Sequence, residues 1–270
     1  VLVDTVMEVH GVNGDYVTIS GPNVGSDGIW LDSGLEGFLD PTSEAITKSP
    51  GGRPGTRFVS SRITERTIVF RVTIANDNHQ WESRDTRWRK LWSYSEYSRI
   101  RVYSKGSYRE LHCRLDSIEV DTTYDPHFND ATTAVMTVVA DDPFWYGEEL
   151  VTELSGGSNT IRNANPTSNL VFPKLVLEAP GTWTVRIGNG RSITFPTLGS
   201  GEDTVVNYDP GSRQLVSANK SGVWARMNGV RLDDSIPPYT DTLKVQVSGP
   251  SGRSAQLRLA RPFNRPWGDI

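Results

Sequence analysis

The stretch from residue 140 to residue 147, with the sequence ADDPFWYG, limits the possible folds of this chain more than any other. The run before it, residues 133–139, is rich in β-branched residues and predicts a strand. Pro143 cannot donate a backbone hydrogen bond, so this strand must stop or reach a sheet edge there. Three aromatic residues follow, and their apolar surface must pack against other groups. Because the chain then becomes small and polar as far as Ser158, the stretch predicts the closing strand of a domain.

The composition favours half-solvated β-strands over a helical enzyme core. Hydrophobic residues make up 36% of the 270 residues and the mean hydropathy is -0.43, but eight tryptophans help to raise the aromatic share to 9%. Low hydrophobicity combined with many aromatic residues suits antiparallel sheets that have one face in water. A chain of this length predicts one large or two medium domains.

Membrane segments, a signal peptide and disulfides are not expected. No apolar run approaches the roughly 20 residues that span a bilayer, and no basic start precedes an apolar segment. Cys113 is the only cysteine, which excludes an intrachain disulfide and a cysteine-rich zinc site. We therefore expect folding in a reducing cytosol, with core packing as the source of stability.

The formal net charge of -4 hides a difference between two parts of the chain. Residues 1–150 have 15 Lys and Arg against 23 Asp and Glu, whereas residues 151–270 have 13 against 9. Within the first part, residues 53–114 carry an excess of positive charge and are flanked by acidic segments. Opposite signs support two domains and would allow charge matching between copies of the chain. The same charges could instead neutralise one another within one copy.

Residues 1–150 are typical of an α+β domain, with antiparallel strands and one helix. The clearest strand is residues 66–74, where β-branched residues surround Phe70. Residues 99–120 also alternate in the manner of strands. Residues 40–57 contain many turn-forming residues and few apolar ones, so they predict a long exposed loop or arm.

The predicted helix runs from about residue 81 to residue 97. At about 100° per residue, Trp81, Trp88 and Trp92 fall within a narrow stripe. We interpret this stripe as a core face packed on the sheet and not as a base-stacking platform for nucleic acid. The basic residues of the helix mostly lie elsewhere and indicate a solvated face; they are Arg84, Arg87, Arg89 and Lys90.

Residues 170–270 show no helical period and predict a β-sandwich or jelly roll. Asn189-Gly190 and the turn at residues 209–211 mark two hairpins between short strands. The preceding residues 151–169 contain small polar residues and predict a linker. The expected order is therefore an α+β domain at 1–150, a linker at 151–169 and a sandwich at 170–270.

The residues that could support catalysis or ligand binding do not form a recognisable site. The histidines lack metal-ligand spacing, the acidic residues of 121–142 lack the calcium-loop pattern, and no phosphate-binding loop occurs. His112 and Cys113 are neighbours in a predicted strand and must face opposite sides. Asp233-Asp234 could imitate a glycosidase pair, but a sequence does not give the carboxyl separation. We predict no catalytic, cofactor-binding or metal site and no bound cofactor. The histidines and acidic residues considered are His10, His79, His112, His127, Asp121, Asp125, Asp130, Asp141 and Asp142.

The organisation resembles the distal tail protein family of long-tailed, siphovirus-type bacteriophages, whose members are often called minor tail proteins. The resemblance rests on the strand at 66–74, the helix end at 88–92, the strands at 99–120 and the aromatic stretch at 140–147. That last stretch looks like the family's domain-closing motif. The hairpin at 203–216 is similar to one in the family's galectin-like second domain, and the resemblance covers nearly the whole chain.

The resemblance implies a structural protein of the virion, made in the host bacterial cytoplasm and located at the distal end of the tail, with no enzymatic activity. It implies a ring, commonly hexameric, that connects the tail tube to the tip or baseplate and its adsorption apparatus. The first domain would build the ring and the galectin-like sandwich would lie outside it. Expected partners are further copies of the chain, the tail tube, tape measure and tail-tip hub proteins and, as an open option, a receptor-binding protein. No nucleic acid partner is expected.

Two other classes of function stay open. A β-sandwich with exposed Trp183, Trp224 and Trp267 would suit a carbohydrate-binding protein that contacts the host cell surface. A tail-associated cell-wall hydrolase would need two acidic residues side by side in a cleft. A screen for glycan binding separates the first class from a pure connector.

Overall fold

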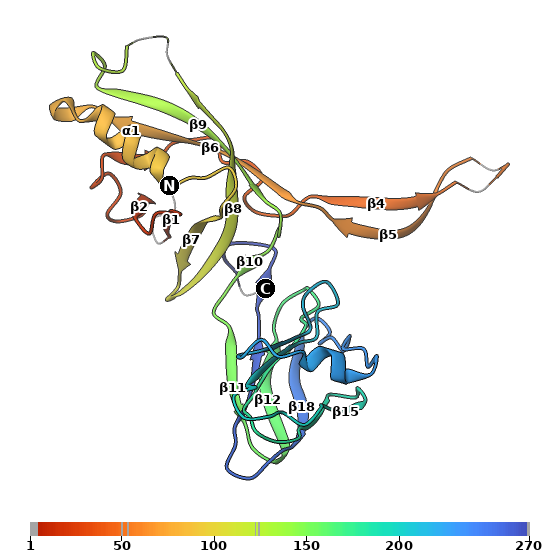
Figure 1. Ribbon diagram of the computed structural model, residues 1–270. Coiled ribbons are helices and arrows are strands. Elements are labelled where there is room, and N and C mark those ends of the chain that lie inside the picture. The colour runs from red at the N-terminus through yellow and green to blue at the C-terminus, as the bar shows by residue number, and fades with distance from the viewer. Residues whose placement is uncertain (1–4, 50, 53, 122, 124, 269–270) are drawn as a thin grey trace. The chain divides into compact units, whose positions relative to one another are not determined.

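The computed structural model describes residues 5–268 except residues 50, 53, 122 and 124. The chain divides into two compact units. The first contains the residues up to Trp145 and the segment that starts at Asn264, and the second is Tyr146–Phe263. Both consist mostly of antiparallel strands (Figure 1). The fold is therefore mainly β, as the sequence predicts.

The first unit is built on one antiparallel sheet with the strand order β2-β1-β7-β8-β9-β6-β3. Its strands alternate between buried and exposed residues, so one face of the sheet forms a core. β2 and β3, at the two ends of the order, lie next to each other, so the sheet curls toward closure. The strand predicted at residues 66–74 is confirmed and is one residue longer. The bounds are β1 (Val6–His10), β2 (Tyr16–Ser20), β3 (Ile29–Leu31), β6 (Arg66–Ala75), β7 (Ser98–Ser104), β8 (Ser107–Val120) and β9 (Ala131–Ala140).

The helix α1 (Trp81–Lys90) is shorter than the sequence predicts. It follows a 3₁₀ turn, η1 (Asp77–His79), and ends because the backbone tightens: the N–H groups of Leu91 and Trp92 donate to carbonyls three residues back. Residues up to 97 then turn around the Ser93 hydroxyl, which accepts hydrogen bonds from two backbone N–H groups. Trp88 and Trp92 of the predicted stripe are buried, as predicted.

Trp88 joins the helix to the sheet. Its indole Nε1 lies 3.3 Å from the sulfur of Met136 on β9, and its ring meets Trp92 edge-on at 5.6 Å. Trp92 in turn packs 6.1 Å from Phe70 on β6. Trp81 is only half-buried and lies edge-on to His127. The stripe is thus core at its C-terminal end and partly solvated at its start.

The segment predicted as a long exposed loop or arm at residues 40–57 is exposed, but much of it belongs to a two-stranded hairpin, β4 (Ser43–Lys48) and β5 (Arg57–Ile63). We call this hairpin the arm. Every residue of both strands is exposed, and Figure 1 shows the arm extending away from the other strands of its unit. Because no face of the arm is buried, its sequence lacks the alternation that reveals a strand.

The second unit is a sandwich of two antiparallel sheets, with strand orders β11-β19-β13-β16-β17 and β12-β18-β14-β15. One hydrophobic cluster holds residues from both sheets, including Leu175, Leu257 and Val245. The hairpin predicted around Asn189-Gly190 is confirmed as the pair β14 and β15. The bounds are β11 (Leu150–Leu154), β12 (Gly157–Asn165), β13 (Lys174–Leu177), β14 (Thr184–Ile187), β15 (Ser192–Thr194), β16 (Thr204–Asn207), β17 (Leu215–Ser217), the 3₁₀ turn η2 (Val223–Met227), β18 (Thr240–Ser248) and β19 (Ala255–Leu259).

The linker predicted at residues 151–169 is wrong. β11 and β12 occupy most of it and pair with β19 and β18, one in each sheet of the sandwich. Their polar residues are the solvent-facing half of strands and not a flexible tether. The second unit accordingly starts at Tyr146 and stops at Phe263, where the two-residue strands β10 (Trp145–Tyr146) and β20 (Pro262–Phe263) lie.

Candidate assembly site: the arm and its base

The arm offers apolar side chains to solvent without a covering layer. Ile46, Val59 and Phe58 are 48%, 48% and 62% exposed. The strands are joined in register from Ser43 opposite Ile63 to Lys48 opposite Arg57, with one irregularity after Ile46. An isolated two-stranded hairpin is marginally stable in water. An arm of this kind needs support from its base or from a partner.

Arg66 holds the base of the arm. It begins β6, three residues after the arm ends, and its side chain is buried. Its guanidinium donates to the backbone oxygens of Phe38 at 2.9 Å, Pro143 at 2.8 Å and Asn264 at 2.8 Å. Two longer bonds reach Gly37 at 3.3 Å and Leu39 at 3.2 Å. One side chain therefore joins three segments that are far apart in the sequence.

Burial lowers the pKa of Arg66 to about 10, because the charged guanidinium is removed from water. The negative charge of Asp40 acts in the opposite direction. The acceptors are all backbone carbonyls, which carry partial charge only, and they satisfy the donors without forming an ion pair. At neutral pH the group stays cationic.

Gly37 is required beside Arg66. Its φ of +68° lies in the left-handed region, and an added Cβ would lie 2.0 Å from the Thr67 carbonyl oxygen. The backbone at the base of the arm can therefore approach β6 only through a glycine.

Residues 264–268, which we call the strap, return to the first unit and brace the same place. Arg265 forms a two-bond ion pair with Asp40, at 2.7 and 2.8 Å. Arg109 on β8 donates to the backbone oxygens of Arg265, at 2.8 Å, and of Gly268. The ion pair lowers the pKa of Asp40, chiefly through the hydrogen bonds from Arg265. The strap is thus fixed both to the start of the arm and to the sheet.

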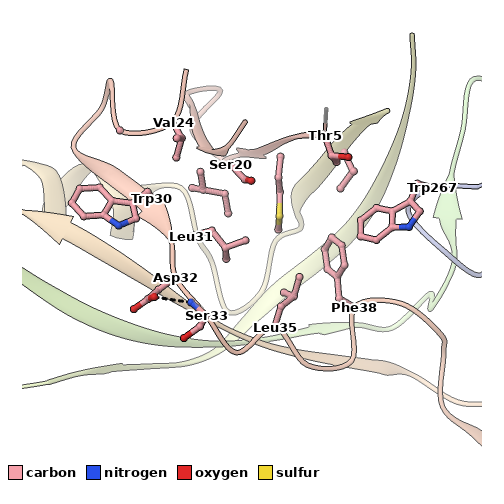
Figure 2. A pocket seen from close by; sticks show the side chains of 14 residues that line it. Thr5, Ser20, Val24, Trp30, Leu31, Asp32, Ser33, Leu35, Phe38 and Trp267 are labelled. Atoms are coloured by element: carbon pink, nitrogen blue, oxygen red, sulfur yellow. Dashed lines mark hydrogen bonds between the residues drawn. The ribbon is translucent and has the colours of Figure 1, made fainter. Parts of the chain in front are cut away.

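Aromatic packing completes the base. The ring of Phe38 meets that of Trp145 edge-on, with 5.0 Å between the ring centroids. The ring of Trp267, in the strap, is tilted relative to that of Phe38, and their centroids are 5.7 Å apart. Trp145 is fully buried, which confirms that the aromatic stretch after Pro143 packs into a core. Phe38 and Trp267 also form one wall of a pocket of about 720 Å³, whose remaining lining is mostly apolar and includes Trp30 and Leu31 of β3 (Figure 2).

Comparison with known proteins shows the family to which this chain belongs. No protein-family model matches the chain. The minor tail protein Gp27 of Mycobacterium phage L5 is 31% identical over 99% of both chains, and its counterpart in phage D29 is 30% identical over 99% of both. The chain belongs to this family of phage minor tail proteins. It is a structural component of a phage tail, and the resemblance stated from the sequence is confirmed.

Solved structures with the same fold include other phage tail proteins. The Dit protein of phage SPP1, described as a paradigm of the hub adsorption apparatus in phages that infect Gram-positive bacteria, aligns with a TM-score of 0.69. The alignment covers 96% of this minor tail protein and 99% of Dit, at 14% identity. A chain of the phage p2 baseplate in its activated conformation with strontium aligns with a TM-score of 0.51 over 97% and 99% of the two chains, at 11% identity. These likenesses establish the fold.

The residues considered from the sequence as candidates for chemistry are dispersed in the minor tail protein. In the described part of the chain, no group of three or more His, Cys, Asp or Glu side chains is arranged to hold a metal. His112 is exposed and Cys113 buried, on opposite faces of β8, as predicted. Burial raises the pKa of the Cys113 thiol to about 12, so it stays protonated. His127 lies 3.0 Å from Asp125, and Asp141 accepts a hydrogen bond from Tyr97 at 2.7 Å.

Two of the three tryptophans predicted to be exposed are not. Trp183 is buried, and its Nε1–H donates to the Glu178 carbonyl at 2.9 Å. Trp267 packs on Phe38, while Trp224 is 46% exposed. The inner face of a sandwich needs large apolar residues, and this need outweighs the surface role that the sequence suggested for Trp183.

Several charges predicted to face solvent or neighbouring copies are paired within the chain. Arg87 of α1 lies 2.7 Å from Asp15 and 2.6 Å from Asp27, so the helix is not simply solvated on this side. Arg114 pairs with Asp141 at 3.3 Å. These contacts favour the alternative that the opposite charges of residues 1–150 neutralise one another within one copy. The charge pattern is therefore weak support for contacts between copies.

Sequence reasoning missed Arg66 and the strap. The acceptors of Arg66 lie up to 198 positions away, and no local pattern marks a carbonyl as a partner. A basic residue at a buried position of a clear strand was the one available signal, because a buried arginine needs partners.

Proposed function

We propose that this minor tail protein forms a closed ring, a hexamer, at the distal end of the tail, through its first unit. The ring connects the tail tube to the tip or baseplate and the adsorption apparatus. Its partners are then further copies of the chain, the tube, tape measure and hub proteins, with a receptor-binding protein as a further candidate. The fold shared with the SPP1 Dit protein, itself described as part of a hub, supports this role.

The arm is the observation that carries the proposal. It exposes Phe58, Val59 and Ile46, yet its base is fixed by the five hydrogen bonds of Arg66 and by the ion pair of Arg265. A firmly anchored segment with uncovered apolar side chains is suited to a partner surface. Because a ring requires heterologous contacts, the arm of one copy must meet a different surface on the next. The apolar pocket beside Phe38 is such a surface, and we place the arm of the neighbouring copy there.

Replacing the arm tests the proposal cleanly. The Thr64 N–H donates to the Thr42 carbonyl at 3.0 Å, so residues 43–63 can be exchanged for a two-residue Asn-Gly turn without opening the base. The parent chain should give a ring mass in native mass spectrometry, and the armless variant should fold but remain monomeric. Phe58→Ser should weaken the ring, whereas Phe128→Ser, at an 88% exposed site outside the arm, should not.

Two outcomes would contradict parts of the proposal. A parent chain that stays monomeric at high concentration, together with a tail reconstruction that lacks its ring, removes the ring itself. Rings formed by the armless variant would remove the arm as a contact. Cysteines that replace Phe58 in the arm and Ser33 in the pocket lining should cross-link between copies if the arm binds in the pocket. The native Cys113 is buried and should not compete in this reaction.

We also propose that the chain has no enzymatic activity. The acidic residues that could imitate a hydrolase pair, Asp233 and Asp234, are sequence neighbours on one loop and not opposed across a cleft of two elements. The pure protein should leave bacterial cell walls intact in a turbidity assay. Clearing that a single Asp or Glu substitution abolishes would overturn this statement.

A further inference from the structure

The second unit has a polar hollow of about 730 Å³ on the outward side of the sheet β12-β18-β14-β15. It lies between the β14–β15 turn, strand β18 and the loop at residues 234–240. Its lining includes Arg186, Asn189, Asp234, Lys244 and Gln246, and all of its lining residues belong to this unit.

Asp234 is the unusual group in this hollow. Its carboxylate is half-buried and lies against Gly190, so close that an added Cβ on that glycine would be 2.8 Å from one oxygen. Within the part of the chain that the structure describes, it forms no hydrogen bond and no ion pair. Burial, and then the charge of Asp233, raise the pKa of Asp234, while the charge of Arg191 acts in the opposite direction. A partly desolvated carboxylate without donors has free energy to gain from a ligand that supplies them.

Potential hydrogen-bond donors line the same hollow. Arg186 bonds the Gly190 carbonyl through Nε at 2.9 Å, which orients its guanidinium over the turn. Lys244 and Gln246 on β18 are exposed, and among the described residues their side chains have no intrachain hydrogen bond. An unpaired acceptor and free donors thus meet in one concave place, as they do in small-molecule sites.

The hollow continues along the sheet. Gln246 also lines a second hollow of about 340 Å³, whose other residues include Ser158, Ser192 and Ser248. Gln246 is opposite Ser158 on one side and Arg186 on the other, so the two hollows share one polar sheet face. The groove therefore has room for more than one unit of a chain-like ligand.

The chemistry of the groove selects the class of ligand. The exposed strand positions around Gln246 are hydroxyl, amide or cationic, and the hollow contains one carboxylate, Asp234. A protein partner would need an apolar centre, and Pro237 is the one exposed apolar side chain among the lining residues, since Ile187 and Leu243 are buried. Nucleic acid would need many cations and would be repelled by the carboxylate. A ligand with closely spaced hydroxyls can both donate to Asp234 and accept from Lys244.

We propose that this groove binds a glycan, with Asp234 accepting hydrogen bonds from sugar hydroxyls and with Arg186, Lys244 and Gln246 donating to the sugar oxygens. The site differs from the one that exposed tryptophans suggested, since Trp183 is buried. Tyr239, which is 62% exposed, precedes Thr240 of the lining in the sequence. The inference is independent of ring formation.

The test uses the full chain and a panel of purified cell-envelope polysaccharides, some neutral and some bearing uronic acid or phosphate groups. Binding is measured by titration calorimetry. Asp234→Asn and Lys244→Ala should each weaken binding by about tenfold or more, the loss expected for one hydrogen bond to a charged group. Gly190→Ala should do the same by displacing the carboxylate. Lys174→Ala, at an exposed lysine of the opposite sheet, should change the affinity less than about twofold.

Thermal melting of each variant separates loss of binding from loss of folding. The proposal fails if no polysaccharide of the panel binds, or if binding survives Asp234→Asn and Lys244→Ala in folded protein. It also fails if calcium alone binds and Asp234→Asn abolishes that binding, since the carboxylate would then serve a cation. Selective binding of the acidic polysaccharides would support the proposal. It would indicate that Arg186 and Lys244 bind the anionic groups of the glycan.

Discussion

Replacing Arg66 by methionine should destabilise the first unit by about 3–5 kcal/mol, because each buried carbonyl that loses its donor costs about 1–3 kcal/mol. The change removes five donated hydrogen bonds, three of them between 2.8 and 2.9 Å, and leaves the carbonyls of Phe38, Pro143 and Asn264 without this donor. Each hydrogen bond to a charged group contributes about 1.5–3 kcal/mol. Relief of the buried charge offsets part of this sum, because a desolvated ion costs several kcal/mol. Methionine fills much of the same volume, so the cavity effect stays small.

Urea denaturation followed by tryptophan fluorescence measures this loss selectively. Six of the eight tryptophans lie in the first unit, so the signal reports mainly its unfolding. Arg71→Met is the matched control, since Arg71 is an exposed residue of the same strand and should change stability by less than about 0.5 kcal/mol. Arg66→Lys should fall between the two, because an ammonium keeps the charge but not the planar fork.

The reasoning also predicts a local effect. Hydrogen exchange of the Thr64 N–H, which closes the base of the arm, should be faster in Arg66→Met by more than the global change explains. Equal stability of Arg66→Met and Arg71→Met would refute the role of the network. Full rescue by lysine would show that charge, and not the geometry of the fork, holds the base.

Three further predictions concern the helix and one acidic residue. Trp88→Ala should destabilise the first unit by about 3–5 kcal/mol, since its indole is fully buried; a loss below about 1 kcal/mol in the same titration would contradict the core assignment. Arg87→Ala should cost about 1 kcal/mol more than Lys90→Ala, because Arg87 contacts two carboxylates; equal losses would show that these ion pairs add nothing. The hydrogen bond from His112, with a neighbouring guanidinium, lowers the pKa of Glu110 to about 2 from 4.5, so Glu110 stabilises the fold above pH 4.5 and this stabilisation is lost as the pH falls toward 2. After discounting for solvent screening, Glu110→Gln should cost about 1 kcal/mol at pH 7 and nothing near pH 2, and a cost independent of pH would contradict the shift.

The elements that the sequence predicted are mostly those in which buried and exposed residues alternate along the element. The strand at 66–74 and the buried Trp88 follow from local periodicity, and the β14–β15 hairpin follows from Asn189-Gly190. The linker prediction failed because Ser155 to Ser158 read as flexible, although they lie at the turn between two strands with one solvated face. The arm was predicted as a segment but not as strands, since neither of its faces is buried.

The candidate sites were harder to predict for a physical reason. Arg66 and Asp40 act through partners that the fold brings from residues 264–265, more than 190 positions away. The groove around Asp234 combines a loop, a turn and a strand that no spacing rule connects. Sites of this kind depend on contacts between segments that are far apart in the sequence. Local sequence patterns do not show which distant segments meet.

The strap has a consequence for how the protein is made. Ribosomes add about 5–20 residues per second, so the roughly 120 residues of the second unit separate the synthesis of Trp145 from that of Asn264 by about 6–24 s. During that interval the nascent first unit lacks an acceptor for Arg66, the partner of Asp40 and the ring of Trp267. An arm whose base is unfinished is poorly placed to join neighbouring nascent chains on one messenger RNA. If copies assemble through the arm, as we propose, the strap would delay that assembly until each copy has been translated through its second unit.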